Sequence, residues 1–359
     1  MLAALITAPG QDKLEIRDAV EATGFGPGKV RVAIKATGLC HSDLSGMSGK
    51  IPGPAPLVLG HEGAGQVLEV GDGVTHVRPG DRVIVNWRPA CGRCPHCRIG
   101  ESNLCDSGSQ AMRVPAFTSR GTDLYRFMGA GTFAEEVVLD AGFAVPLPDD
   151  VSYEAAALIG CGVTTGIGAA INSSGVKPGE NVAVIGCGGV GISAVMGAKA
   201  AGAAQIVAVD PVARRRDWAR DFGATTAVAP DELAGAVADL TGGLGFDHVI
   251  EAVGRPGTVR SAYEAARRGG TMCLVGVGGF EDMLPVNLLE LFVSAKRIVP
   301  SVYGGDDVTR TYDRIIGLLR AGRIDLEALV THRLPLAQVN DALDLMRTGE
   351  ALRVMLTND

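Results

Sequence analysis

The sequence predicts an α/β protein built from two domains of different architecture. Residues 1–155 read as short strands broken by Gly and Pro, which is typical of a β-rich core with long loops. From about residue 160, apolar strands alternate with alanine-rich helices, and such alternation builds a doubly wound parallel sheet with helices on both faces. The length of 359 residues accommodates two or three domains.

Each predicted element follows from a local pattern of apolar residues. Short apolar runs bounded by turn residues predict strands at Lys29–Ala36, Gly65–Gly71, Asp81–Val85, Val182–Gly186, Gln205–Asp210, His248–Ala252 and Thr271–Gly276. Apolar residues at helical spacing predict helices at Val190–Ala201, Arg214–Phe222, Asp231–Leu240, Thr258–Arg268, Thr309–Ala321 and Gln338–Thr348. The last two helices belong to a C-terminal tail, which we expect to pack back onto the first domain.

Composition and charge exclude several classes of protein. Hydrophobic residues make up 47% of the chain and charged residues 20%, which is too apolar for a disordered protein. The net charge is −7 and no long basic run occurs, so nucleic acid is not an expected partner. The N-terminus does not resemble a signal peptide, and no segment offers about 18 uninterrupted apolar residues for a membrane span. A cytoplasmic location is therefore expected.

Four closely spaced cysteines predict a structural zinc site. Cys91, Cys94, Cys97 and Cys105 follow the spacing C-x2-C-x2-C-x7-C. Four thiolates complete a tetrahedral zinc site and leave no open position for a substrate, so this zinc would be structural. Clustered cysteines in an intracellular protein favour metal over disulfides. The alternative is a pair of disulfides within residues 91–105.

A glycine-rich turn follows the predicted strand that ends at Gly186. Residues 186–191 read G-C-G-G-V-G, which matches the pattern G-x-G-x-x-G between a strand and a helix. In that context Gly186 permits a tight turn, Gly188 lets the backbone approach a pyrophosphate, and Gly191 lets the helix pack on the strand. Phosphates are favoured at the helix N-terminus because its N–H groups are free. The sequence therefore predicts a dinucleotide-binding site.

The acidic residue Asp210 indicates which dinucleotide binds. It ends the next predicted strand, where a carboxylate can accept hydrogen bonds from the ribose hydroxyls of the adenosine. A carboxylate there repels a 2′-phosphate, so NAD is favoured over NADP. The neighbouring Arg214–Arg216 argue mildly the other way, because an arginine could hold that phosphate.

Three further residues are candidate ligands of a second zinc. Cys40, His61 and Cys161 would form a Cys2His set with a fourth position free for water or substrate, which is a known catalytic arrangement. These residues are 21 and 100 positions apart, so their spacing does not show that they converge. Taken singly, a cysteine is more often a buried core residue, and a histidine is usually structural.

Taken together, these motifs resemble those of a known enzyme family. The run Gly60–Gly71, which reads G-H-E-G-A-G-Q-V-L-E-V-G, looks like the zinc signature of the medium-chain dehydrogenase/reductase family. The four-cysteine segment and the glycine turn follow in the family's order. The resemblance covers essentially the whole chain and is closest to zinc-dependent alcohol dehydrogenases. The segment Asn86–Gly92 is similar to the actinobacterial branch, which contains nicotinoprotein and mycothiol-linked members.

The resemblance implies a domain plan and cofactors. It implies a GroES-like catalytic domain over residues 1–160 and 303–359, with a structural zinc lobe at residues 88–106. A Rossmann NAD-binding domain is expected over residues 161–302. Each subunit is expected to hold two zinc ions and NAD, with NADP as the less favoured cofactor. A homodimer is expected, with a homotetramer as the alternative.

The resemblance also implies roles for single residues. The residues expected in catalysis are Cys40, His61 and Cys161 as zinc ligands, Glu62 beside the metal, Asp43 behind His61, and Ser42 on the alcohol oxygen. The residues expected to contact the cofactor are Gly186, Gly188, Gly189, Val190, Gly191, Asp210, Arg215, His41, Thr165, Val277 and Arg353. Trp87 falls where the family has an aromatic wall of the substrate pocket, although it could instead be a core residue.

The implied reaction is hydride transfer between an alcohol and NAD, with an apolar or aromatic primary alcohol as the expected substrate. Ser45 stands where many alcohol dehydrogenases have a histidine at the end of the proton relay, so we expect the proton to leave through water. Around Gly49–Ile51 and at Ser109 we find no acidic pair or arginine of the kind that binds glutathione in the formaldehyde dehydrogenases, so a glutathione adduct is not the expected substrate. The alternatives are a nicotinoprotein with tightly bound NAD(H), a mycothiol-dependent formaldehyde dehydrogenase, and a non-enzymatic nucleotide-binding relative.

Overall fold

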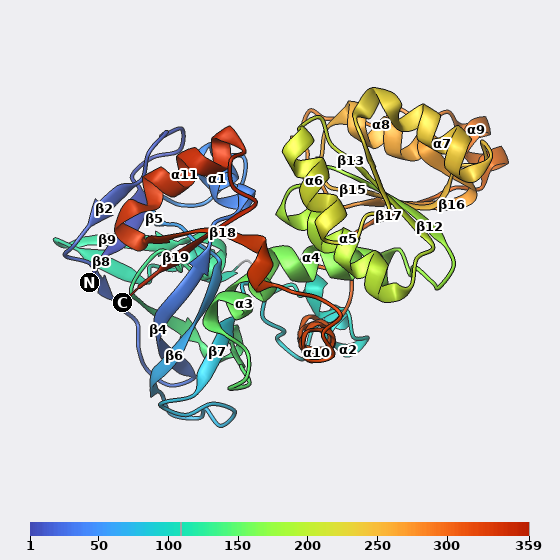
Figure 1. Ribbon diagram of the computed structural model, residues 1–359. Helices are drawn as coiled ribbons and strands as arrows, with labels where there is room; N and C mark the ends of the chain where they lie inside the picture. The colour runs from blue at the N-terminus through green and yellow to red at the C-terminus, as the bar shows by residue number, and fades with distance from the viewer. Residues whose placement is uncertain (108–109, 359) are drawn as a thin grey trace. The chain divides into compact units, whose positions relative to one another are not determined.

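The structure, a computed structural model, describes residues 1–107 and 110–358. The chain forms two compact units (Figure 1). The first unit contains residues 1–162 and 325–359, and the second contains residues 163–324. The first is rich in β-structure and the second contains a parallel sheet with helices, which confirms the predicted α/β fold class.

Two sheets make up most of the first unit. One sheet has the strand order β2 (Glu15–Arg17), β1 (Ala3–Ile6), β5 (Leu57–Val58), β9 (Thr122–Arg126), β8 (Phe117–Ser119) and β3 (Glu21–Ala22). The other has the order β11 (Ala144–Pro146), β7 (Arg82–Val85), β6 (Glu62–Val70), β4 (Lys29–Gly38), β19 (Arg353–Thr357) and β18 (Val330–Pro335), and β10 (Glu136–Asp140) also pairs with β4. The helices of this unit are α1 (His41–Met47), α2 (Pro95–Arg98), α3 (Tyr153–Leu158) and α11 (Val339–Thr348).

Strand β4 organises the first unit because it pairs along its length with several strands. Its side chains alternate between the core and the outside over most of its length, as period-two patterning requires. The C-terminal strand β19 pairs antiparallel with its end, with Met355 opposite Gly38. The tail thus returns to the first unit and completes the sheet.

The second unit is a doubly wound parallel sheet. Its strand order is β14 (Thr226–Val228), β13 (Gln205–Val209), β12 (Asn181–Ile185), β15 (Phe246–Glu251), β16 (Ala266–Leu274) and β17 (Arg297–Pro300). Its helices are α4 (Thr164–Gly168), α5 (Gly189–Ala201), α6 (Ala213–Asp221), α7 (Leu233–Thr241), α8 (Pro256–Ala265), α9 (Leu288–Ser294) and α10 (Val308–Arg320). Figure 1 shows α5 and α6 on one face of the sheet and α7, α8 and α9 on the other. The strand order reverses between β12 and β15, where such folds bind ligands.

Most predicted elements agree with the structure to within a few residues, but two assignments differ. The helix predicted over Thr258–Arg268 ends at Ala265, because Ala266 pairs with Phe246 as the start of β16. Residues 303–324, expected in the catalytic domain, lie in the second unit. There, Tyr312 of α10 is buried and its hydroxyl hydrogen-bonds that of Tyr303.

The sequence patterns did not predict one long helical run, Tyr153–Ser173. Among the described residues it is the one helix long and apolar enough to cross a membrane by length and composition. However, 83% of its apolar window is buried inside the protein, as in the core helix of a globular domain. A helix that is apolar on all sides has no polar face, so periodicity does not reveal it.

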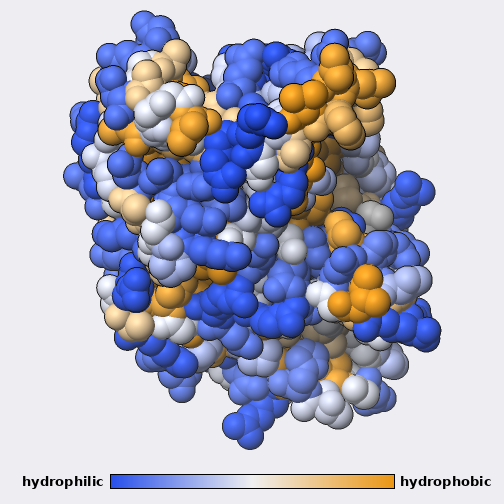
Figure 2. Space-filling model, turned by 90° about the vertical axis from the view of Figure 1, so that its right-hand side faces the viewer, coloured by the Kyte–Doolittle hydropathy of each residue, from blue (hydrophilic) through white to orange (hydrophobic). Residues whose placement is uncertain are grey.

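Hydrophobic surface is concentrated in the second unit. Figure 2 shows separate hydrophobic patches on a largely hydrophilic face. The exposed large apolar residues between β16 and α10 are Val277, Phe280, Met283, Leu288, Leu289, Phe292, Val293, Ile298 and Val302.

Candidate active site

Side chains that are distant in the sequence converge in the first unit. Cys40 immediately precedes α1, His61 immediately precedes β6, and Cys161 lies in the helical run after α3. The donor atoms of these residues and of Glu62 lie within 4.8 Å of one another, and all four residues are buried. Around Cys161, residues Ile159–Val163 adopt a π-helical turn, an irregularity that is frequent at functional sites.

Asp43 holds this cluster in place. Its Oδ1 lies 3.1 Å from His61 Nδ1 and accepts a hydrogen bond from Gly60 N at 3.2 Å. Its Oδ2 accepts from Cys40 N at 2.9 Å. His61 Nε2 is buried and, among the described residues, has no hydrogen-bond partner. An imidazole fixed through Nδ1 with a free, buried Nε2 beside two thiols fits a zinc ion.

The protonation of the donors is strongly perturbed. A hydrogen bond from Cys161 lowers the pKa of Cys40 well below its usual range, against the effect of burial. The same hydrogen bond and burial raise the pKa of Cys161 well above its usual range. For His61, burial alone would lower the pKa, but Asp43 and Cys40 together outweigh burial and raise the pKa well above its usual range. A cation that binds here displaces protons, so its affinity rises with pH.

The Glu62 side chain lies against the donor set and is paired with a cation. Its Oε2 accepts a hydrogen bond from Arg353 Nη2, and its Oε1 accepts from Gly162 N at 3.1 Å. Burial raises the pKa of Glu62 to about 7, and the Arg353 guanidinium opposes this rise. A Cβ at Gly38 would collide with Glu62 Oε2, so the glycine leaves the space that the buried pair needs.

Aromatic rings and a hydroxyl lie next to these ligands. The Trp87 ring contacts the His61 ring edge-on at a centroid distance of 6.4 Å, and Phe127 does so at 5.6 Å. Trp87 also packs against the hydrophobic core of the unit, and its place in the wall of a substrate pocket stays a prediction. Ser42 Oγ lies 3.7 Å from Cys40 Sγ. The sequence did not predict Phe127, because a phenylalanine in a short 3-10 helix carries no metal-site signal.

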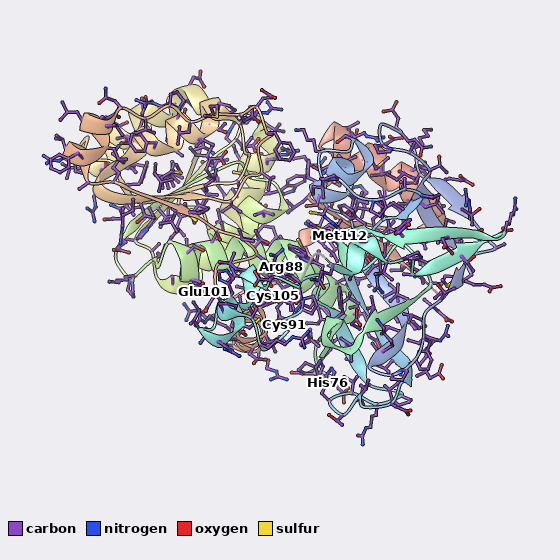
Figure 3. All side chains as sticks on the ribbon, turned by 180° about the vertical axis from the view of Figure 1, so that it is seen from behind. His76, Arg88, Cys91, Glu101, Cys105 and Met112 are labelled. Carbon is purple, nitrogen blue, oxygen red and sulfur yellow. The ribbon has the colours of Figure 1, made fainter. Side chains whose placement is uncertain are left out.

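The second cysteine cluster is compact and closer to the surface. The sulfur atoms of Cys91, Cys94, Cys97 and Cys105 lie within 4.8 Å of one another. All eight cysteines of the chain are free, so the disulfide alternative is wrong. Backbone N–H groups point at the sulfurs, as from Cys91 N to Cys105 Sγ at 3.3 Å. Figure 3 labels Cys91 and Cys105 together with Arg88, which donates to Cys105 O at 3.4 Å.

The glycine turn of the second unit has the geometry of a phosphate-binding turn. Gly186 has φ of 92°, which only glycine adopts without strain. A Cβ at Gly191 would collide with Gly186 O, so this glycine is needed for the close packing of α5 on β12. A Cβ at Gly188 would meet no atom within 4 Å, which leaves open space at the N-terminus of α5. Gly189 and Val190 form the first turn of this helix.

The acidic residue at the end of β13 is already engaged by the backbone. Asp210 is buried, its Oδ2 accepts from Cys187 N at 2.9 Å, and its Oδ1 accepts from Val212 N at 2.9 Å. Arg215 Nη1 lies 3.9 Å from Asp210 Oδ2. The carboxylate is thereby fixed beside the glycine turn, and its oxygens retain lone pairs for further hydrogen bonds.

The other expected cofactor contacts are distributed over both units. Thr165 lies in α4 and Val277 lies in the loop after β16, both in the second unit. His41 begins α1 in the first unit, and Arg353 begins β19 in that unit. The structure gives Arg353 a partner that the sequence did not suggest, namely Glu62.

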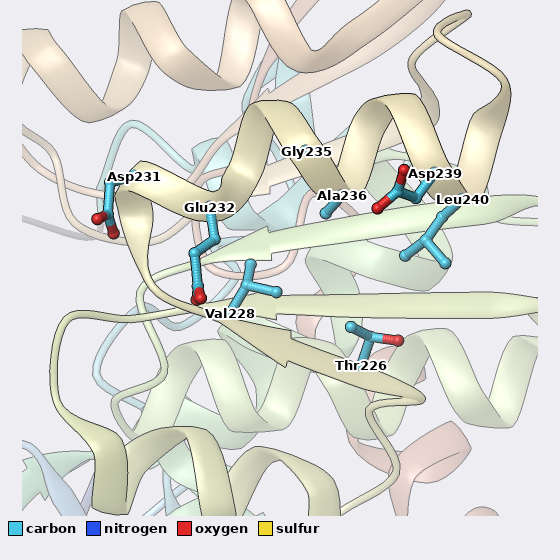
Figure 4. Close-up of a pocket in the computed structure, with 8 residues that line it drawn as sticks. All are labelled: Thr226, Val228, Asp231, Glu232, Gly235, Ala236, Asp239 and Leu240. Atoms are coloured by element: carbon cyan, nitrogen blue, oxygen red, sulfur yellow. The ribbon is translucent and has the colours of Figure 1, made fainter.

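A surface pocket of the second unit lies apart from these residues. It is lined by β14 and α7 and carries the carboxyl groups of Asp231, Glu232 and Asp239 (Figure 4). Glu232 Oε2 accepts from Ala229 N at 2.7 Å and so caps the helix. None of the predicted site residues lines this pocket.

Comparisons with known proteins agree with this geometry. Residues 26–149 match the alcohol dehydrogenase GroES-like domain, and residues 189–319 match the zinc-binding dehydrogenase family. The S-(hydroxymethyl)glutathione dehydrogenases of Escherichia coli and Shigella sonnei are each 37% identical over 366 residues, which is 99% of this chain and 98% of theirs.

Solved structures share the whole fold. An alcohol dehydrogenase zinc-binding domain protein from Burkholderia ambifaria has a TM-score of 0.93 and 32% identity, with coverage of 100% of this chain and 98% of that one. Benzyl alcohol dehydrogenase from Acinetobacter calcoaceticus has a TM-score of 0.92 and 28% identity, with coverage of 100% and 99%.

A doubly wound nucleotide-binding unit, a buried Cys2His donor set and a four-cysteine lobe define a zinc-dependent dehydrogenase. The chain belongs to the zinc-dependent alcohol dehydrogenases of the medium-chain dehydrogenase/reductase family. This confirms the resemblance to zinc-dependent alcohol dehydrogenases, together with the predicted enzyme class, the two zinc ions and NAD as the typical cofactor. The similarity of Asn86–Gly92 to the actinobacterial branch stays a prediction.

Proposed function

We propose that the protein oxidises a primary alcohol with an apolar or aromatic side chain, and reduces the corresponding aldehyde, with freely exchanging NAD. The buried donor set carries the proposal, because Cys40, His61 and Cys161 leave the fourth tetrahedral position for the alcohol oxygen. Zinc held by these residues supplies Lewis-acid polarisation of that oxygen. Gly186–Gly191 of the second unit would hold the pyrophosphate of NAD and Asp210 would hold its ribose, and NAD when bound would supply the hydride acceptor.

The neighbouring residues of the first unit orient the reactants and move the proton. Asp43 fixes the His61 ring through Nδ1, which would leave Nε2 as the nitrogen that binds zinc. Ser42 Oγ is close enough to the ligands to hydrogen-bond the alcohol oxygen and to pass its proton outward. Ser45 is not a base near neutral pH, so the proton continues through water. Arg353 holds Glu62 beside the ligands, where its carboxylate would be available as a further ligand of a bound zinc ion.

Two observations support an apolar or aromatic substrate. Trp87 and Phe127 both contact the His61 ring, which places aromatic surface beside the metal ligand. The S-(hydroxymethyl)glutathione dehydrogenases offer the opposite candidate, because their substrate is a charged glutathione adduct. Residues Gly49–Ile51 contain no acidic pair or arginine that would bind it. Ser109, the other position considered, lies outside the described residues.

Metal analysis combined with a substrate panel tests the proposal. We expect two zinc ions per subunit and no absorbance of reduced nicotinamide in the purified protein. With added NAD, benzyl alcohol and medium-chain primary alcohols should give a kcat/KM at least about tenfold higher than formaldehyde with glutathione, because a buried polar mismatch costs at least about 1.4 kcal/mol. The reverse ranking would contradict the substrate class. Reduced nicotinamide that stays bound through gel filtration would identify the protein as a nicotinoprotein. Activity that requires mycothiol would identify it as a mycothiol-dependent formaldehyde dehydrogenase.

We further propose that the protein is a cytoplasmic homodimer joined through α9 and β17. All eight cysteines are free thiols, which persist in a reducing compartment. On α9, Glu290 pairs with Arg260 of α8, whereas Leu288, Leu289 and Phe292 are exposed. A helix with its apolar residues outward favours a protein partner.

The adjoining strand supports the same interface. Strand β17 pairs with β16 on one edge, and no strand of the described sheet pairs with its other edge. A second copy related by a two-fold axis can pair its own β17 with this free edge. The same contact would cover the exposed apolar residues of α9 in both copies. Phe292→Glu should convert the dimer to a monomer in analytical ultracentrifugation. The control Leu244→Glu, at an exposed leucine after α7, should leave the dimer intact. A dimeric Phe292→Glu variant would contradict this interface.

A further inference from the structure

A buried carboxyl group at the end of β15 has no role in the sites described so far. Glu251 is the last residue of this strand and is 0% exposed. Its Oε1 accepts hydrogen bonds from Val253 N at 3.0 Å, Gly254 N at 2.9 Å and Thr258 Oγ1 at 2.7 Å. Burying a carboxyl group is costly unless it is hydrogen-bonded, so these bonds fix the turn formed by residues 252–254.

The backbone of the same residue holds a second turn. The carbonyl oxygen of Glu251 accepts from Val275 N at 2.8 Å and from Gly276 N at 2.9 Å. These residues follow β16 and begin the loop that contains Val277. One residue therefore connects the turns that follow two neighbouring strands of the parallel sheet.

The two turns are packed too closely for any residue but glycine. A Cβ at Gly276 would collide with Gly254 N, and a Cβ at Gly254 would lie 2.6 Å from Val277 N. The first turn also meets the phosphate-binding turn, since a Cβ at Gly186 would lie 2.6 Å from Val253 Cγ2. A shift of either turn would therefore be transmitted to the glycine turn.

The position of these turns indicates which half of the cofactor they meet. In this fold the dinucleotide lies across the carboxyl ends of the strands, with its pyrophosphate at the N-terminus of α5. The adenosine half lies toward β13, where Asp210 is placed for the ribose hydroxyls. The nicotinamide half then lies on the other side of the strand-order reversal, over β15 and β16.

We propose that Glu251 is a positioning residue that holds these two turns in the conformation that binds the nicotinamide half of the cofactor. The inference rests on the proposed NAD-dependent function. The hydrogen bonds order both turns before the cofactor arrives, so binding does not have to supply the cost of ordering them. Glu251 touches neither substrate nor cofactor and acts through the backbone of residues 252–254 and 275–277.

Ligand binding by Glu251→Gln tests this role without measuring turnover. The amide would place N–H groups against backbone N–H donors and loosen the turn. We expect the Kd for NADH, measured by fluorescence titration, to rise about 5- to 20-fold. The Kd for ADP-ribose, which lacks the nicotinamide, should stay within about twofold. Hydrogen exchange at Val253 and Gly254 should become faster in the cofactor-free protein. Thr258→Val, which removes one donor, should shift NADH affinity in the same direction by less.

The other end of β15 provides a matched control. Asp247 accepts from Asn181 N at 2.8 Å and from Arg267 Nε at 2.6 Å, at the amino edge of the sheet. Asp247→Asn should lower stability without changing NADH affinity. Three results would overturn the positioning role. Glu251→Gln could weaken NADH and ADP-ribose binding equally, or it could leave NADH affinity unchanged. Asp247→Asn could also weaken NADH binding as much as Glu251→Gln does. Absence of NADH binding by the unmodified protein would instead overturn the proposed function itself, and this inference with it.

Discussion

The two cysteine sites of the first unit hold the same kind of metal ligand in opposite settings. The lobe site takes its four cysteines from residues 91–105, and three of these cysteines are partly exposed. The site at Cys40, His61 and Cys161 is assembled from three distant segments, and its ligands are at most 7% exposed. The lobe therefore needs little more than local turns, whereas the buried site depends on the packing of the whole unit.

The difference extends to the charges around each site. In the lobe, the thiols are mainly stabilised by nearby backbone N–H groups. The buried site instead contains Asp43, Glu62 and Arg353, each of which is at most 5% exposed. Buried charges are tolerated only when paired, so the surroundings of this site are as constrained as its ligands. The four-cysteine site, whose ligands are close in the sequence, is suited to a structural ion. The buried site, whose ligands and charged neighbours come from distant segments, is suited to catalysis.

Removal of a zinc ligand from the buried site should have the largest effect on activity. We expect Cys40→Ala to lower kcat/KM by at least about 10³-fold, because the metal that polarises the alcohol is lost. Zinc content should fall from two ions to one. Cys273→Ala removes a buried cysteine outside both sites and should keep both zinc ions and most activity. Full activity of Cys40→Ala would disprove the assignment of the catalytic site.

Loss of the buried ion pair should give the next largest effect. Arg353→Met leaves the Glu62 carboxyl group buried without its partner and should lower the free energy of unfolding by about 3–5 kcal/mol. Glu62→Gln in the same chain should recover part of this loss. The control is Glu101→Gln, which breaks the exposed pair with His96 near the lobe and should cost about 1 kcal/mol or less. The free energies of unfolding are measured by denaturant unfolding. If Arg353→Met and Glu101→Gln lowered them equally, the buried and exposed ion pairs would not differ as proposed.

Removal of a lobe ligand should affect stability more than chemistry. Cys94→Ala should release the lobe zinc and lower Tm by roughly 2–8 °C, because the ion no longer links Cys91, Cys97 and Cys105 to one another. The variant should keep its catalytic zinc, and its kcat at 25 °C should stay within about threefold of the original. These values can be checked by calorimetry, metal analysis and initial rates. A collapse of kcat with a normal Tm would show that the lobe serves catalysis directly.

The smallest effect concerns the pH at which zinc-free thiols react. Hydrogen bonds from Arg93 N and Cys94 N lower the pKa of Cys91 to about 6, whereas burial raises the pKa of Cys97 to about 12. Thiolate predominates only above the pKa, so alkylation of Cys91 should rise through about pH 6 while Cys97 reacts little at neutral pH. Burial should also protect Cys161, whose pKa is well above its usual value. Peptide mapping after iodoacetamide treatment measures this, and a Cys91 midpoint near the ordinary thiol pKa of about 8.5 would contradict it.

Much of the fold was predictable because its signals are local. The glycine turn at residues 186–191 and the strands β12 and β13 follow from backbone sterics and from short apolar runs. The lobe was predictable because its four ligands are close in the sequence. The buried run Tyr153–Ser173 and the membership of residues 303–324 in the second unit were not, since both depend on what surrounds them.

By itself, the sequence determined the α/β class, the glycine turn and the four-cysteine site, because each of these depends on residues that are neighbours along the chain. Only the tertiary structure decided that Cys40, His61 and Cys161 share one site, that Arg353 pairs with Glu62, and that Glu251 joins two turns. The physical reason is that metal geometry, desolvation and buried hydrogen bonds depend on distances between atoms. For residues far apart in the chain, these distances become fixed only when the chain folds.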